Sequence, residues 1–230
     1  MKTVTRWLRN ILIFFFVSTI LSVVILKYIP VYITPLMLIR CVEAVINGEE
    51  PAIRHHWVPL ERINHNLPQA VMASEDNLFL KHSGFDLEQI QKAQFEAQEG
   101  KRQRGASTIS QQTARNVFLW QQRSWLRKGL EAYFTFLIEG IWGKERIMEV
   151  YLNSIEMGKN IYGADAVAHI NFNTTPDRLT KDQSAYIAVS LPNPLKRDSA
   201  HPTDKMKKMQ RTIKKRMTQI DQFPRDVCAD

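Results

Sequence analysis

The first strongly patterned stretch of the chain is apolar and uninterrupted. No residue from Asn10 to Leu26 is charged, and the apolar character continues past Lys27 as far as Ile29. A helix of about 20 such residues crosses about 30 Å of hydrocarbon, because each residue adds 1.5 Å along the axis. The pattern therefore predicts one transmembrane helix over residues 10–29.

The flanks of this stretch decide its orientation and supply a competing interpretation. Three basic residues, Lys2, Arg6 and Arg9, precede it. The positive-inside rule then keeps residues 1–9 in the cytoplasm and sends the rest of the chain across the membrane. A basic start before an apolar stretch is also typical of a cleaved signal peptide. The stretch is longer than a usual signal core, and no small-x-small cleavage site follows it, which favours a retained anchor.

Residues 30–50 have a different, mixed character. Val31–Ile46 is apolar but is interrupted by one proline and by two charged residues. This mixture predicts a membrane-proximal amphipathic segment that lies along the bilayer rather than a second span. The turn-forming sequence Gly48–Pro51 marks the boundary with a single domain, which we place at residues 51–230.

The pattern within that domain is helical. From Leu67 onward apolar residues recur mainly at spacings of three and four, as in the run from Leu130 to Ile141, and alternating strand-like runs are few. Gln94–Arg104 is polar without an apolar face, and we expect a mobile loop there. The sequence therefore predicts a mostly α-helical domain behind one N-terminal transmembrane helix.

Net charge limits the classes of binding partner, and the two cysteines raise the question of a disulfide. The formal net charge of +8 would suit nucleic acid, anionic lipid or a phosphate-bearing substrate, but nucleic acid is excluded behind a transmembrane segment. The basic run Lys205–Arg216 has methionine and isoleucine on one face, and its simplest interpretation is the solvated side of an amphipathic helix. Cys41 and Cys228 could pair in an oxidising compartment, or they could remain free thiols.

Two segments concentrate the groups that could do chemistry. The first, Ser74–Asp86, holds carboxylates, an imidazole and two aromatic rings, and the second, Arg104–Asn116, sets a glycine turn and a run of hydroxyls and amides before a cation. Both are typical of a site for sugar and phosphate. In the first the residues of interest are Glu75, Asp76, Phe79, His82 and Gly84; in the second they are Gly105, Ala106, Ser107, Thr108, Ile109, Ser110, Gln111, Gln112, Arg115 and Asn116.

Further short motifs follow in a fixed order. These are Arg127, Lys128 and Glu131; then Lys144, Ile147, Glu149, Tyr151, Leu152 and Asn153; and finally Leu191-Pro192-Asn193-Pro194. With the two earlier segments they resemble, in order, the five motifs of the peptidoglycan glycosyltransferases, over roughly residues 68–197. Arg115 is a departure, since the family usually has lysine there. The transpeptidase patterns Ser-x-x-Lys and Lys-Thr-Gly do not occur, so we expect the monofunctional form.

This resemblance implies a fold and an activity. The fold would be a lysozyme-like helical catalytic domain with a smaller membrane-facing lobe. The activity would be polymerisation of lipid II into linear β-1,4-linked glycan strands, with inversion at the anomeric carbon and release of undecaprenyl pyrophosphate. The enzyme would sit in the bacterial cytoplasmic membrane with its catalytic domain in the periplasm. Its partners would be lipid II, the growing lipid-linked strand, the membrane and other cell-wall synthesis proteins.

The resemblance also assigns roles to residues. Glu75 would be the base that takes the proton of the attacking 4-hydroxyl, and Glu131 would assist departure of the pyrophosphate. No cofactor or protein metal site is expected, although a divalent cation, Mg²⁺ or Mn²⁺, that bridges the pyrophosphate stays open. Substrate binding is assigned to Asp76, Ser107, Thr108, Gln111, Gln112, Arg115, Asn116, Arg123, Arg127 and Lys128.

Each assignment has a structural alternative. Glu75 and Asp76 could be helix-start acids that interact with the helix dipole. Glu131 could form an i,i+3 salt bridge with Lys128, and Ser107 and Thr108 could cap a helix. At the level of function, the alternatives are a lytic, lysozyme-like hydrolase and a membrane-anchored scaffold with a degenerate site.

Overall fold

The computed structural model describes residues 2–99 and 107–229 of the chain, and they are mostly helical, as predicted. The helices are α1 (Lys2–Tyr28), α2 (Pro35–Ile46), α3 (Asn66–Glu75), α4 (Leu87–Gln98), α5 (Ile109–Phe118), α6 (Trp125–Ile141), α7 (Lys144–Ser154), α8 (Gly163–Phe172), α9 (Lys181–Ser190) and α10 (Asp204–Arg216), with short 3₁₀ helices at Leu60–Arg62 and Pro176–Arg178. Three short strands, β1 (Arg54–His55), β2 (Glu156–Gly158) and β3 (Ile161–Tyr162), form a sheet in the order β1-β3-β2.

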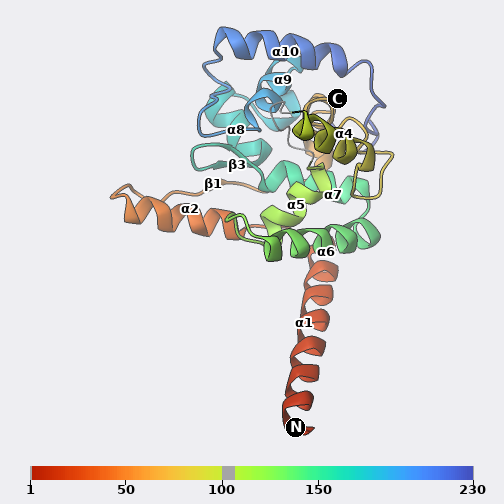
Figure 1. The fold of residues 1–230 in the computed structure, drawn as a ribbon. Coiled ribbons are helices and arrows are strands. Elements are labelled where there is room, and N and C mark those ends of the chain that lie inside the picture. Colours follow the sequence, from red (N-terminus) through yellow and green to blue (C-terminus); the bar gives the residue numbers. More distant parts are fainter. Residues whose placement is uncertain (1, 100–106, 230) are drawn as a thin grey trace.

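Helix α1 projects from the domain as a single long rod (Figure 1). Its segment Thr3–Tyr28, 26 residues, is long and apolar enough to cross a membrane. Its C-terminal end is docked on the domain: Trp142 Nε1 donates a hydrogen bond to the Val23 carbonyl at 2.7 Å, and Arg146 Nη2 donates to the Leu26 carbonyl at 2.7 Å. Val23 is fully buried and belongs to the main core. The predicted anchor is therefore a helix whose last turns are also part of the domain.

Helix α2 occupies the segment predicted to be amphipathic. Thr34 caps its first turn and Pro35 takes the first helical position, where a missing N–H costs nothing. Leu36 and Met37 are buried against Tyr162, whereas the other side of the helix leaves large apolar side chains exposed. The exposed residues are Leu38, Val42, Val45 and Ile46.

Two layers of helices build the domain around the end of α3. Helices α5, α6 and α7 pack on one another, and α3, α9 and α10 pack as a second group. In Figure 1 α6 lies across the end of the domain where α1 emerges, and α10 lies at the opposite end. Residues from both groups of helices, among them Val71, Ile138 and Tyr151, share a continuous buried core.

Two expectations differ from the structure. Residues 94–98 belong to α4 rather than to a loop, because the Asp86 carboxylate caps the helix by accepting from Gln89 N at 2.9 Å and most of its residues are good helix formers. The remainder of the expected loop, residues 100–104, lies outside the described residues. Cys41 and Cys228 are free thiols, so the alternative of a disulfide is wrong.

Gly163, at the junction of β3 and α8, offers a test of this packing. Its φ is +81°, and a Cβ there would lie 2.6 Å from the Asn153 carbonyl oxygen. We expect Gly163→Ala to lower the free energy of unfolding by about 2–4 kcal/mol, because backbone cannot move away as a flexible side chain can. Gly140→Ala, in an open position of α6, is the control and should be neutral or slightly stabilising. Thermal unfolding in detergent measures both, and equal midpoints would show that the junction is not tightly packed.

Candidate active site

Glu75 is the last residue of α3 and lines a cavity of about 500 Å³. Its Oε2 accepts a hydrogen bond from Gln112 Nε2 at 3.1 Å, and its Oε1 accepts one from Ser74 Oγ at 3.2 Å. Burial raises the pKa of the Glu75 carboxyl, and these two donors oppose that rise. The helix-start interpretation of Glu75 is wrong, since the carboxylate lies at the negative end of the helix dipole.

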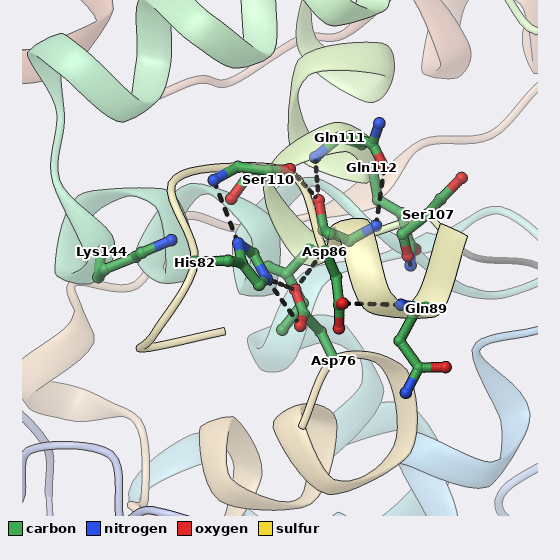
Figure 2. A network of polar contacts seen from close by, with 12 residues as sticks. Asp76, His82, Asp86, Gln89, Ser107, Ser110, Gln111, Gln112 and Lys144 are labelled. Carbon is green, nitrogen blue, oxygen red and sulfur yellow. Dashed lines mark hydrogen bonds and ion pairs between the residues drawn. The ribbon is translucent and has the colours of Figure 1, made fainter. Parts of the chain in front are cut away.

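The neighbouring Asp76 is held inside the protein (Figure 2). Its two carboxylate oxygens lie 2.9 and 3.0 Å from His82 Nε2, and Oδ2 also accepts from the backbone N–H of Ile109 at 2.9 Å. His82 therefore has a structural role as a hydrogen-bonding partner of Asp76. Asp76 links the end of α3 to the start of α5, and its predicted contact with substrate stays a prediction.

The start of α5 is fixed by its own side chains. Thr108 and Gln111 form a reciprocal capping box, in which each side chain satisfies a backbone N–H of the other. The Thr108 hydroxyl also donates to the Gly84 carbonyl at 2.7 Å. Helix capping is therefore confirmed for Thr108, while Ser107 lines the cavity just before the helix. Gly105 and Ala106 of the same motif lie outside the described residues.

Gln112 connects the cavity to a second polar region. While its amide nitrogen donates to Glu75, its amide oxygen accepts from the Tyr151 hydroxyl at 3.2 Å. Arg115 lies three residues further along α5, so it follows Gln112 on the same side of the helix. Burial lowers the pKa of Arg115, and the nearby Glu131 carboxylate opposes that change. The Arg115 Nε is buried and has no partner among the described residues.

Glu131 lies at the centre of this second region and is 1% exposed. It accepts from Arg127 Nη1 at 2.6 Å and from Lys128 Nζ at 2.5 Å. The predicted i,i+3 pair with Lys128 is present, and Arg127 adds a second, buried partner. Arg115 is an electrostatic neighbour of Glu131, of Arg127 and of the exposed Arg123 in the loop before α6. We call the four cations Arg115, Arg123, Arg127 and Lys128, with Glu131, the cationic cluster.

Asn116 and Gln111 complete the residues assigned to substrate binding. Asn116 is buried and its Nδ2 has no hydrogen-bond partner in the described part of the chain. Gln111 is buried and committed to the capping box, so its contribution to the site is to hold α5. The structure thus gathers the assigned residues along α5 and at the start of α6, but it divides them between the cavity and the cationic cluster.

Some residues that organise the site were not found from the sequence. Glu139 of α6 accepts from Ser110 Oγ at 2.5 Å and from Lys144 Nζ at 2.7 Å, which joins α5, α6 and the start of α7. Lys144 also lies over the Phe79 ring, 4.6 Å from its centroid. The sequence did offer one signal for Glu139, because a charged residue within the apolar run from Leu130 to Ile141 needs a polar partner.

Most residues of the fourth motif pair with other parts of the domain instead of lining the cavity. The Asn153 amide exchanges two hydrogen bonds with the backbone of Val58, at 2.9 and 2.8 Å. Glu149 binds Arg146, which in turn reaches the end of α1. Among the described residues no three His, Cys, Asp or Glu side chains gather into a set that could hold a metal ion.

Comparison with known proteins agrees with this geometry. A family model described as "Transglycosylase" matches residues 43–218. A protein of Bacteroides thetaiotaomicron is 56% identical over 97% of this chain and 90% of its own length. Proteins of Bdellovibrio bacteriovorus (46% identical; 94% of this chain, 86% of their own) and Caulobacter vibrioides (49%; 85% and 84%) are also similar. All three are named biosynthetic peptidoglycan transglycosylase. The chain belongs to the transglycosylase family of monofunctional peptidoglycan glycosyltransferases.

Proposed function

We propose that this chain polymerises lipid II into linear β-1,4-linked glycan strands, with inversion at the anomeric carbon and release of undecaprenyl pyrophosphate. The observation that carries the proposal is the pairing of a desolvated carboxylate, Glu75, with a cationic cluster on the same helix-built site. The first suits removal of a proton from a sugar hydroxyl, and the second suits a leaving group that carries phosphate. The names of the similar proteins support the same substrate class.

In the proposed reaction Glu75 acts as the general base. The 4-hydroxyl of an N-acetylglucosamine attacks the anomeric carbon of an N-acetylmuramyl unit, and Glu75 takes the hydroxyl proton as the new C–O bond forms. A raised pKa makes the ionised carboxylate a stronger base than that of an ordinary glutamate. Among the described residues no cation lies within ion-pair distance of Glu75, so its charge is available for the proton.

The cationic cluster receives the charge that develops on the pyrophosphate. Arginine offers two parallel N–H groups to phosphate, and Arg115 has an unpartnered Nε in this region. Glu131 holds Arg127 and Lys128 in place and balances one of the four positive charges. Both of its oxygens are engaged by these cations, and no further carboxylate, imidazole or thiol ligands gather among the described residues. The side chains therefore do not fit a protein metal site, and we assign the leaving-group role to the cations.

The same arrangement fits a substrate held in a bilayer. We propose that α1 spans the cytoplasmic membrane with residues 1–9 inside, so the domain faces the periplasm. Helix α6, which begins with the cationic cluster, lies at the end of the domain where α1 emerges (Figure 1). Its Trp125 is 93% exposed and Leu126 is 69% exposed. Exposed aromatic and apolar side chains beside cations suit the membrane interface, where the pyrophosphate of a lipid-linked sugar lies.

Two other functions predict different chemistry. A lytic hydrolase also needs a glutamate in a helical domain. Its leaving group is a sugar hydroxyl without phosphate, however, so four clustered cations would have no negative charge to neutralise. A scaffold with a degenerate site would not keep both Glu75 and Glu131 in these environments. Incubation with purified lipid II and, separately, with finished cell wall distinguishes the three: the first gives polymer only for a synthase, and the second gives fragments only for a hydrolase.

The assignment of the base predicts the behaviour of Glu75→Gln. Polymerisation of lipid II in liposomes should fall at least about a hundredfold, because a general base typically contributes that much or more. The fold should be retained, since burial disfavours the charged carboxylate and the amide is neutral. Glu61→Gln, which removes an exposed carboxylate, is the control and should keep the wild-type rate. A Glu75→Gln protein that polymerises within tenfold of wild type would show that another group is the base.

The environment of Glu75 also predicts the pH dependence of the rate. Only the ionised carboxylate accepts a proton, and its pKa is raised by burial, so the rate should fall with decreasing pH at a pH above that of an ordinary glutamate. Gln112→Ala removes a donor to the ionised form and should move this fall to still higher pH. Tyr151→Phe keeps the hydrogen bond from Gln112 to Glu75 and should shift the pH at which the rate falls by a smaller amount. Superimposable profiles for wild type and Gln112→Ala would contradict this account.

Arg115 tests the leaving-group site. Arg115→Lys keeps the charge and should be mild. Arg115→Ala should reduce the rate by roughly ten- to a hundredfold at subsaturating donor, which corresponds to about 1.5–3 kcal/mol for a lost charge-assisted contact. Added acceptor should relieve little of this loss, and Arg62→Ala, at an exposed position away from α5, is the control. Equal rates for wild type and Arg115→Ala would remove this side chain from the phosphate site.

A further inference from the structure

Helix α10 carries a concentration of positive charge that the proposed reaction does not use. Between Asp204 and Arg216 there are seven basic side chains and one acidic side chain. Two of the basic residues are paired, Lys207 with Asp204 and Lys214 with Asp182. The remaining five, which we call the α10 basic face, are exposed and have no carboxylate within ion-pair distance among the described residues. They are Lys205, Lys208, Arg211, Lys215 and Arg216.

The orientation of this face is fixed by packing. Met206, Ile213 and Met217 are buried against α3 and α9, together with Ala70, Ala185 and similar residues. With 3.6 residues per turn, Lys208, Arg211 and Lys215 then lie on the opposite side of the helix. The positive charges on this face repel one another, and no acidic side chain among the described residues pairs with them. A bound polyanion would relieve that repulsion. Such a surface attracts polyanions.

The position of α10 argues against the anionic headgroups of the anchoring membrane as the ligand of the α10 basic face. Helix α10 lies at the end of the domain opposite to α1 (Figure 1). The domain, including α3 and α9, lies between this helix and the docked end of α1. Electrostatic attraction in physiological salt fades over about 8 Å, so anionic headgroups around α1 would not be felt at α10.

The α10 basic face is continuous with the cavity that holds Glu75. Arg216, Gln219 and Ile220, at and just beyond the end of α10, line that cavity together with Glu75 and Ser107. The lipid-linked end of a growing strand is confined to the bilayer, so the rest of the strand must extend from the site away from the membrane. Helix α10 lies across the end of the domain that is farthest from α1 (Figure 1).

We propose that the α10 basic face binds the acidic peptides of the glycan strand as the strand leaves the active site. The peptides on a peptidoglycan strand end in carboxylates, which are ionised at neutral pH and recur along the polymer. A row of lysine and arginine side chains matches repeated carboxylates by charge and can slide along them, because exposed ion pairs are individually weak. This inference rests on the proposed function and extends it to retention of the product.

Binding to purified glycan strands tests the inference. Two probes are used with the full-length protein in detergent: strands that carry their peptides, and the same strands after the peptides have been removed. The wild type should prefer the peptide-bearing strands. Lys208→Gln/Lys215→Gln should bind them about fivefold more weakly at low salt, as expected for two lost exposed ion pairs, and should make shorter strands from lipid II. Lys208→Arg/Lys215→Arg keeps the charges and should bind like the wild type.

A matched variant controls for net charge. Arg62→Gln/Arg178→Gln removes two exposed charges elsewhere on the domain and should keep wild-type binding and strand length. Equal binding of both probes by the wild type, or unchanged binding by Lys208→Gln/Lys215→Gln, would overturn the inference. So would a loss of binding to anionic phospholipid vesicles without a loss for the strands. A wild-type protein that makes no polymer from lipid II would instead overturn the proposed function, so the two failures are distinguishable.

Discussion

The carboxylate of Asp76 is the contact on which the rest of the site depends. It accepts hydrogen bonds from His82 and from the first backbone N–H of α5, so it binds the end of α3 to the start of α5. A negative charge at a helix N-terminus is also favoured by the helix dipole. Because the capping box then fixes the first turn, the positions of Gln112 and Arg115 follow from helix geometry. One junction thus sets the distance between Glu75 and the cationic cluster.

The position of this site relative to α1 is set by a second junction, between α1 and the domain. Arg146 donates to the Leu26 carbonyl in the last turn of α1, where carbonyls lack partners within the helix, and Trp142 donates to the Val23 carbonyl about one turn earlier. The domain satisfies the end of its own anchor, so the span and the helices α6 and α7 form one continuous structure. A catalytic domain on a flexible tether would sample many heights, whereas this arrangement keeps the start of α6 beside the point where α1 emerges.

The sequence predicted those features that depend on local pattern. The apolar stretch that became α1, the helical spacing after Leu67 and the ordered motifs were all visible without a structure. What it did not predict depends on contacts between distant residues or on where a helix ends. Glu75 was open to interpretation as a helix-start acid because nothing in Ser74–Asp86 shows that α3 terminates there. Glu139 looked like one charge in an apolar helix until its partners Ser110 and Lys144 came from two other helices.

The two glutamates show why residue type alone does not assign a role. Both oxygens of the buried Glu131 carboxylate are held in ion pairs, one with Arg127 and one with Lys128. Desolvation of Glu75 destabilises its charge and raises its pKa, and its two neutral donors, Gln112 and Ser74, only partly oppose that rise. The cations beside Glu131 create the positive field that the proposed departure of a pyrophosphate would require. The difference between the environments of the two carboxylates thus follows from the placement of four basic side chains on α5, on α6 and on the loop between them.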